Sequence, residues 1–140
     1  MKNNMLLEIE NLNVTYETLN KPVAAVRNLS LSLKQNESLG IIGESGCGKS
    51  TLSYAIMGYL SSNGRSCGKI FFNGEDLLEK NQREMMRYRG DRIAMVYQNP
   101  YSSLNPSLTI GRQLDEVTIF HRKLLKKEAR ERSEERRVGK

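Results

Sequence analysis

Nine consecutive residues combine three glycines with a lysine and hydroxyl side chains, a set suited to holding a chain of phosphates. They fit the pattern GxxxxGK[ST] and are Gly43, Glu44, Ser45, Gly46, Cys47, Gly48, Lys49, Ser50 and Thr51. Glycines let the backbone turn its N–H groups toward phosphate oxygens, because they tolerate unusual backbone angles and carry no side chain. Lys49 is expected to reach the outer phosphates, and the Ser50 hydroxyl to ligate Mg²⁺. We call residues 43–51 the phosphate loop.

The segments on either side of the phosphate loop support this interpretation. Residues 39–42 are a short apolar run without alternation, which is typical of a strand buried on both faces. Residues 51–60 carry apolar side chains at helical spacing. A helix that begins at the loop brings unpaired N–H groups and a positive dipole end to the phosphates. This order of strand, loop and helix favours a nucleotide site over an ordinary glycine-rich turn, and Cys47 is interpreted there as a small filler side chain.

The remaining elements follow from apolar spacing and turn residues. Alternating or apolar runs predict half-buried strands over residues 12–16 and 29–33, a strand over 70–72 and a doubly buried strand over 93–96. Helices are expected from Asn81, where Glu84 would complete a cap, and over residues 109–120. Turns and loops are expected over residues 18–22, 61–68, 73–74 and 98–106.

Charge and composition narrow the classes of function. The net charge of +6 is concentrated in residues 121–140, which hold nine Lys and Arg against four Asp and Glu. The first 120 residues hold 13 against 12, so no basic face for nucleic acid is visible. The sequence contains no run of about 18 apolar residues, so no membrane span is expected. The two cysteines are too few for a disulfide scaffold, which makes a reducing, cytoplasmic setting the default expectation.

The end of the chain has an unusual composition. We expect a charged tail at 129–140, and within it residues 132–140 resemble the translation of a sequencing-library adapter. The alternative is a solvated, charged end of a helix. In either case the tail is left out of the functional argument.

Beyond the phosphate loop, the sequence resembles the ATP-binding subunit of an ABC transporter over residues 5–128. Residues 6–16 are similar to the first strands of that family, and Tyr16 occupies the aromatic position that stacks on adenine. Residues 95–98 resemble the strand that leads into the Q-loop, where Gln98 would approach Mg²⁺ and the attacking water. As alternatives, Tyr16 is a core or hairpin aromatic residue and Gln98 a solvated surface residue. The base-reading motif of GTPases, Asn-Lys-x-Asp, is absent, which disfavours a GTPase. A P-loop kinase is the least favoured interpretation.

A narrower resemblance is to the oligopeptide and dipeptide (and nickel) importer branch, carried by residues 39–46 and 98–111. It implies an α/β fold of the P-loop NTPase, ABC-type nucleotide-binding class, here with an antiparallel β subdomain and the start of a parallel-sheet core. It implies ATP and Mg²⁺ as cofactors, Lys49 and Gln98 as catalytic residues, and Ser50 and Gln98 as the Mg²⁺ ligands. The cofactor-binding set is Tyr16 with residues 43–51.

The same resemblance implies partners and a place in the cell. The segment after Gln98 would contact membrane-embedded permease subunits, a second ATP-binding subunit would complete the ATPase dimer, and a substrate-binding protein would act indirectly. The subunit would be cytoplasmic and peripheral on the inner face of the plasma membrane. Its function would be to couple ATP hydrolysis to peptide import, with nickel uptake or another ABC system as alternatives.

Three features of that family are missing from the sequence. The single histidine, His121, has no apolar strand before it, so it is not expected to be the family's switch histidine. The only glycines after Gly90 are Gly111 and Gly139, so no Leu-Ser-Gly-Gly-Gln signature is present. No apolar strand ending in Asp-Glu (Walker B) occurs either, since Asp115 and Glu116 follow Arg112 and Gln113. We therefore expect this N-terminal part of the domain to bind nucleotide without hydrolysing it. A non-catalytic nucleotide-binding fragment remains the alternative to the peptide-import function.

Overall fold

The chain forms two compact units, Met1–Met86 and Arg87–Lys140. A computed structural model describes residues 4–99, 104–122 and 124–137. Within the described residues, no helix combines the length and the apolar character that a membrane crossing requires.

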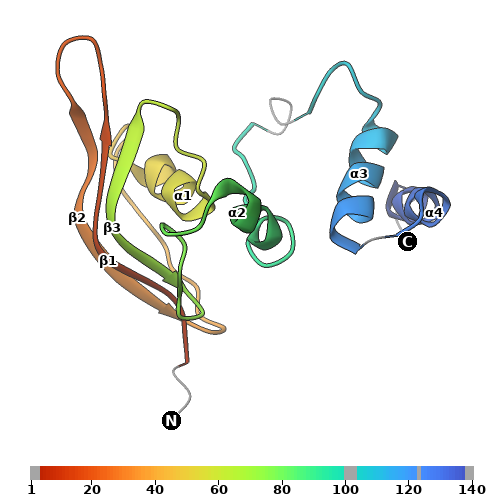
Figure 1. The fold of residues 1–140 in the computed structure, drawn as a ribbon, viewed down its shortest axis with the longest axis horizontal. Coiled ribbons are helices and arrows are strands. Elements are labelled where there is room, and N and C mark those ends of the chain that lie inside the picture. Colours follow the sequence, from red (N-terminus) through yellow and green to blue (C-terminus); the bar gives the residue numbers. More distant parts are fainter. Residues whose placement is uncertain (1–3, 100–103, 123, 138–140) are drawn as a thin grey trace. The chain divides into compact units, whose positions relative to one another are not determined.

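The first unit is built on one antiparallel sheet in the order β2-β1-β3-β4 (Figure 1). Its strands are β1 (Met5–Tyr16), β2 (Val23–Lys34), β3 (Gly64–Phe72) and the two-residue β4 (Glu75–Asp76). The strands predicted at 12–16, 29–33 and 70–72 are confirmed, and each is longer than predicted. The loop predicted at 61–68 is wrong for residues 64–68, which belong to β3 and of which 64–67 pair with β1.

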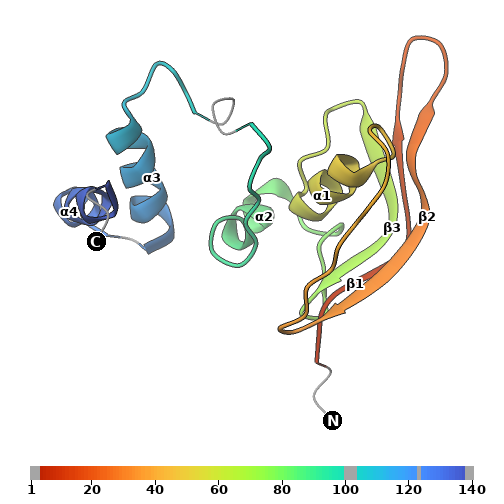
Figure 2. The same cartoon turned by 180° about the vertical axis from the view of Figure 1, so that it is seen from behind.

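The sheet bends where three neighbouring strands depart from regular geometry. Asn11 and Asn28 have φ values of 49° and 44°, and Gly68 has a φ of 107°. Side-chain oxygens take the place of backbone partners at two of these positions. The Asn11 N–H donates to Ser30 Oγ and the Asn28 N–H donates to Asn13 Oδ1, both at 2.9 Å. Irregular positions of this kind are β-bulges, which bend a strand and raise its twist. The result is the curved sheet that Figure 2 shows from behind.

We expect Gly68→Ala to destabilise the first unit far more than Gly74→Ala. Both glycines have positive φ, but an added Cβ at Gly68 would lie 2.6 Å from the Asn11 oxygen and 2.7 Å from the Glu10 oxygen, whereas Gly74 has no atom within 4 Å. The shared φ strain costs about 1–2 kcal/mol, and the clash adds about 1–3 kcal/mol at Gly68 alone. Urea unfolding of the two variants measures the difference. Equal losses of unfolding free energy would contradict the close packing of Gly68 against β1.

Helix α1 (Lys49–Met57) covers the concave face of the sheet (Figures 1 and 2). Its buried residues Leu52, Ala55 and Met57 join a core whose fully buried members lie on the strands. That strand set comprises Ile9, Leu12, Val14 and Ile70. The helix ends at Gly58, whose φ of 62° and N–H bond to the Ala55 oxygen close the last turn. The predicted helix at 51–60 is therefore confirmed, with both ends shifted toward the N-terminus.

Two local predictions in the first unit hold in detail. Asn73 and Gly74 form the tight turn between β3 and β4, with φ values of 50° and 83°. Asn81 caps α2 (Gln82–Tyr88), because its Oδ1 accepts from the Glu84 N–H at 3.1 Å while Glu84 Oε2 accepts from the Asn81 N–H at 2.8 Å. This reciprocal pair is the capping box expected from the spacing.

The two strands predicted to be doubly buried are not formed. Residues 39–42 and 94–97 have no strand assignment, and Ile93 makes only an isolated bridge to Arg89. The side chains of Ile42 and Val96 are 98% and 96% exposed. A strand needs a neighbour to satisfy its backbone groups, and among the described residues none lies beside residues 39–42. The start of the parallel-sheet core thus adopts no sheet structure here, although the apolar residues suited to it are present.

The second unit consists mainly of two packed helices, α3 (Ile110–Arg122) and α4 (Lys126–Arg137). Helix α3 confirms the helix predicted at 109–120. Ala129 of α4 is fully buried, and the Leu125 N–H donates to Glu128 Oε2 at 3.1 Å to cap α4. An ion pair between Arg130 and Glu134, four residues apart, lies on its surface. Most of the charged tail is therefore helical.

Candidate functional site

The phosphate loop leads directly into α1, as the motif requires. Gly46 and Gly48 have φ values of 84° and 97°, and Gly48 is the N-cap of the helix without a capping side chain. The first N–H groups of α1 therefore lack a side-chain partner at the cap, and together with the helix dipole they favour an anion. Open space surrounds the Cα of Gly46, where no atom lies within 4 Å of an ideal Cβ position. The backbone thus suits a phosphate group at this place.

Gly48 also brings the loop against the sheet. A Cβ at this position would overlap the backbone oxygen of Ala25 and lie 3.5 Å from a methyl group of Val26. Glycine is therefore required twice, by its positive φ and by the close approach to β2. Sequence reasoning had not placed Ala25 or Val26 at the site. The one signal in the sequence is the pair of alanines, Ala24 and Ala25, whose small side chains permit a close approach of the backbone.

The Lys49 ammonium lies over the loop rather than in solvent. Its Nζ donates to the Gly43 and Glu44 carbonyl oxygens, each at 2.6 Å, and contacts Cys47 Sγ at 3.3 Å. The Cys47 sulfur in turn occupies the space beside Gly43, where a Cβ would lie only 2.6 Å from it. These contacts hold a positive charge at the loop that also carries the α1 N-terminus. The role of Cys47 as a filler side chain stays a prediction.

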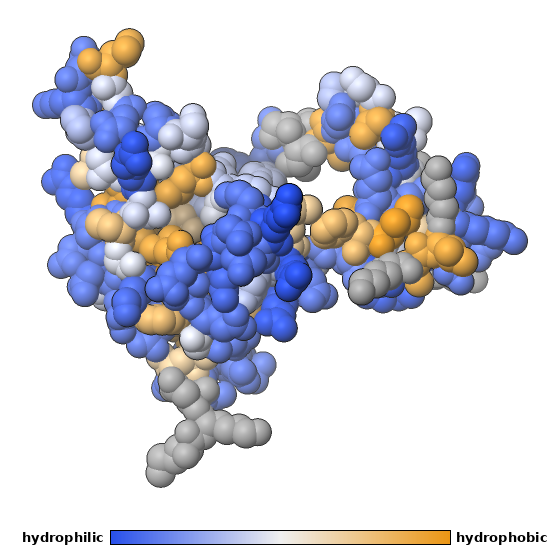
Figure 3. Space-filling model, viewed as in Figure 1, coloured by the Kyte–Doolittle hydropathy of each residue, from blue (hydrophilic) through white to orange (hydrophobic). Residues whose placement is uncertain are grey.

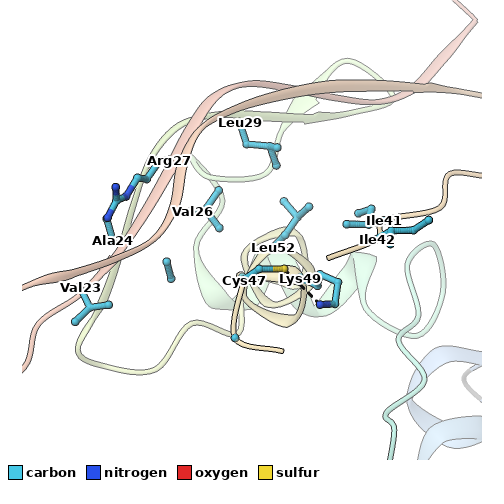
Figure 4. Close-up of a pocket in the computed structure, with 13 residues that line it drawn as sticks. Val23, Ala24, Val26, Arg27, Leu29, Ile41, Ile42, Cys47, Lys49 and Leu52 are labelled. Carbon is cyan, nitrogen blue, oxygen red and sulfur yellow. Dashed lines mark hydrogen bonds between the residues drawn. The ribbon is translucent and has the colours of Figure 1, made fainter. Parts of the chain in front are cut away.

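A hollow of about 530 Å³ adjoins the loop (Figure 4). One wall is β2 from Val23 to Leu29, a second is formed by Ile41 and Ile42, and the base is formed by residues 46–49 with Leu52. Val26 and Leu52 point toward each other in the close-up. The walls of the hollow are thus mostly apolar, with Arg27 as their charged residue, and Lys49 adds a cation beside the loop, which suits a ligand with a charged end and a flat, less polar end.

Ser50 and Thr51 lie in the first turn of α1, immediately after Lys49. Ser50 is exposed and Thr51 is half-buried, and Glu44 and Ser45 are exposed in the loop. A hydroxyl at the start of this helix is an oxygen ligand of the kind Mg²⁺ prefers. Among the described residues, no three His, Cys, Asp or Glu side chains are grouped for a metal. The roles of Ser50 and Gln98 as Mg²⁺ ligands stay predictions.

Tyr16 lies at the end of β1 beside one wall of the hollow. It pairs with Val23, which lines the hollow, and by strand alternation its side chain projects from the same face as Val14. Val14 in turn pairs with Val26, another lining residue. The structure therefore pairs Tyr16 with a residue that lines the hollow, and its stacking on adenine stays a prediction.

The predicted Q-loop residues belong to the second unit. Gln98 is exposed, outside regular secondary structure. Its approach to the phosphate loop, and hence its catalytic and metal-binding roles, stay predictions. Residues 100–103, part of the segment predicted to contact permease subunits, lie outside the described residues.

Comparison with known proteins defines the class to which this site belongs. The family model described as ABC transporter matches residues 26–139. The chain belongs to this family, as the residues around the phosphate loop and Gln98 indicated. Two solved structures of ATP-binding cassettes have the same fold, which confirms the predicted fold class.

The more specific relatives are transport ATP-binding proteins for peptides. The oligopeptide transport ATP-binding protein OppD of Salmonella typhimurium is 45% identical over 130 residues, which cover 93% of this chain and 39% of OppD. The dipeptide transport ATP-binding protein DppD of Bacillus subtilis is 42% identical, with 89% and 38% covered. The chain thus spans about two-fifths of the length of these relatives. They agree with the importer branch predicted from residues 39–46 and 98–111.

One solved structure adds information on ligands. The cassette MJ0796, in a dimeric post-hydrolysis state bound to ADP and Pi, matches with a TM-score of 0.78 and 26% identity. The match covers 93% of this chain and 55% of the cassette. In that protein, therefore, a cassette of this fold holds the two products of ATP hydrolysis.

Proposed function

We propose that the phosphate loop binds ATP, with the triphosphate at residues 43–51 and the base toward Tyr16. The observation that carries the proposal is the Lys49 ammonium held 2.6 Å from two loop carbonyl oxygens, beside a helix that begins with no capping side chain. Cation, backbone N–H groups and helix dipole all favour the same multiply charged anion. The hollow bounded by β2 and Ile41 leaves room for the rest of a nucleotide.

Each residue of the loop has a separate task in this proposal. Gly46 leaves open space for a phosphate group, and Gly48 holds the start of α1 against β2. Lys49 compensates charge on the outer phosphates, and Ser50 and Gln98 are the protein ligands of Mg²⁺. Bound Mg²⁺ would neutralise phosphate charge and fix the geometry of the outer phosphates. Gln98 would sense the γ-phosphate through its neutral amide, which both donates and accepts hydrogen bonds.

In the whole protein, we propose that ATP binding and hydrolysis power the import of di- or oligopeptides. The names of OppD and DppD support this function. The permease subunits, a second ATP-binding subunit and, indirectly, a substrate-binding protein would be the partners, at the inner face of the plasma membrane. Nickel import is the second candidate, since the same resemblance covers that branch, and a non-catalytic nucleotide-binding fragment is the third.

We expect the 140-residue chain to bind ATP saturably and to release no more phosphate than its Lys49→Ala variant. The sequence carries no signature motif and no acidic residues after a buried strand, and losing groups of this kind slows a reaction by orders of magnitude. A fluorescent adenine nucleotide, displaced by unlabelled ATP, measures binding, and release of inorganic phosphate measures turnover. The absence of saturable binding would refute the nucleotide site. Phosphate release above the variant would refute the expectation that hydrolysis needs the missing motifs.

A further inference from the structure

The ring of Tyr16 is bounded on one side by a residue without a side chain. Tyr16 ends β1 and pairs with Gly64, which begins β3. A Cβ at Gly64 would lie 2.9 Å from Cε1 and 3.2 Å from Cδ1 of the Tyr16 ring. The φ of Gly64 lies outside the left-handed region, so the backbone conformation does not call for glycine here. What the position requires is empty space beside the ring.

The turn that contains Gly64 also fixes the backbone next to Tyr16. Glu17 and Asn63 are joined twice, because the Glu17 N–H donates to the Asn63 oxygen and Asn63 Nδ2 donates to the Glu17 oxygen, both at 2.9 Å. The turn is closed internally by the Gly64 N–H on the Ser61 oxygen at 2.8 Å, and the Ser61 hydroxyl lies 2.7 Å from Asn63 Oδ1. The chain on the C-terminal side of Tyr16 is therefore held from residues 61–64.

We infer that residues 61–64 form a positioning element for the Tyr16 ring, with Gly64 as its central positioning residue. Because β1 lies between β2 and β3, Tyr16 pairs with Gly64 on one side and with Val23 on the other, and its ring lies against Gly64. Val23 lines the hollow beside the phosphate loop. The bare Cα of Gly64 lets the ring keep its place, and a methyl group there pushes it away from β3. The inference rests on the proposed function, in which Tyr16 stacks on adenine.

This arrangement separates recognition of the base from recognition of the phosphates. The base depends on a flat ring face at a fixed angle, since aromatic stacking is sensitive to geometry. The phosphates depend on the loop and on Lys49, which none of residues 61–64 contacts through a hydrogen bond. A ligand with phosphates and no base, inorganic tripolyphosphate, therefore reports on the loop alone.

The test compares ATP and tripolyphosphate binding to the 140-residue chain with Gly64→Ala. Stacking on a base is worth enough that misplacing the ring should weaken ATP binding by about fivefold or more. Tripolyphosphate binding should change by less than about twofold, because the loop is untouched. Gly74→Ala is the control, since Gly74 lies in the turn between β3 and β4, does not line the hollow, and has no atom within 4 Å of its Cβ position. It should leave both affinities unchanged.

A second variant keeps the test decisive if Gly64→Ala does not fold. Asn63→Ala removes the bond to the Glu17 oxygen and leaves the bare Cα of Gly64 in place. We expect a smaller loss of ATP affinity, of about twofold to fivefold, again without a change for tripolyphosphate. Equal weakening of both ligands, or no weakening of ATP in either variant, would overturn the inference. If the proposed function itself were wrong, the result would be different, because Lys49→Ala would then bind both ligands as tightly as the unsubstituted chain does.

Discussion

Replacing Lys49 with alanine is expected to weaken ATP binding by about tenfold to a hundredfold. The variant removes the ammonium group that lies 2.6 Å from the Gly43 and Glu44 oxygens. A hydrogen bond to a charged group contributes about 1.5–3 kcal/mol, and this cation would face several phosphate oxygens at once. The same deletion leaves those two carbonyl groups free for water, since both lie in exposed residues. The stability of the fold should therefore change little while affinity falls steeply.

Lys69→Ala is the matched control for Lys49→Ala. Lys69 is an exposed lysine of β3 whose Nζ lies 5.4 Å from the centre of the Phe71 ring, outside the phosphate loop. Both variants lose one positive charge, so any general effect of net charge on an anionic ligand appears equally in both. Isothermal titration with ATP at two salt concentrations separates the local effect from the general one. If Lys49→Ala bound ATP with unchanged affinity, the phosphate loop would not be part of the nucleotide site.

Gly48→Ala is expected to cost about 3 kcal/mol or more of unfolding free energy and to abolish measurable ATP binding. The added methyl group would overlap the Ala25 oxygen, and the φ of 97° is unfavourable for alanine. Left-handed strain accounts for about 1–2 kcal/mol and the overlap for about 1–3 kcal/mol. Relief of the overlap would move the start of α1 away from β2, and Lys49 would move with it.

Gly46→Ala isolates the contribution of backbone strain to the Gly48 result. Gly46 has a similar φ of 84° but no atom within 4 Å of its Cβ position. Its substitution should cost only about 1–2 kcal/mol. Thermal or urea unfolding of the two variants compares them directly. If the two losses were equal, the close approach of the loop to β2 would not be a determinant of stability.

The phosphate loop was predictable from sequence because its requirements are local. Glycines, a lysine and a following amphipathic helix act within a few residues, and the structure places Gly48 and Lys49 at the start of α1 as the motif demands. The capping box at Asn81 and Glu84 was predictable for the same reason. The contribution of β2 was not, since contact between Ala25 and Gly48 joins residues far apart in the chain.

The errors in the strand predictions arise from interactions that no short window contains. Composition assigned residues 64–68 to a loop, but pairing with residues 13–16 of β1 makes them a strand, and Gly68 is accommodated as a bulge. The apolar run at 39–42 has the composition of a buried strand, yet burial depends on neighbours supplied from elsewhere. The pattern correctly identified which residues are suited to a core, and it could not establish whether partners are present.

The exposed run at residues 38–42 has a consequence for the energetics of the adjoining loop. None of the hydrogen bonds among the described residues involves the backbone of this run, and its isoleucine at position 42 is almost fully accessible to solvent. The segment that precedes the loop, residues 38–42, is therefore held only through its chain neighbours, while the segment that follows the loop is held in α1. Ligand capture must then order the preceding segment, which adds an unfavourable entropy to the measured affinity. Any polypeptide that paired with the run would tighten nucleotide capture without touching the nucleotide.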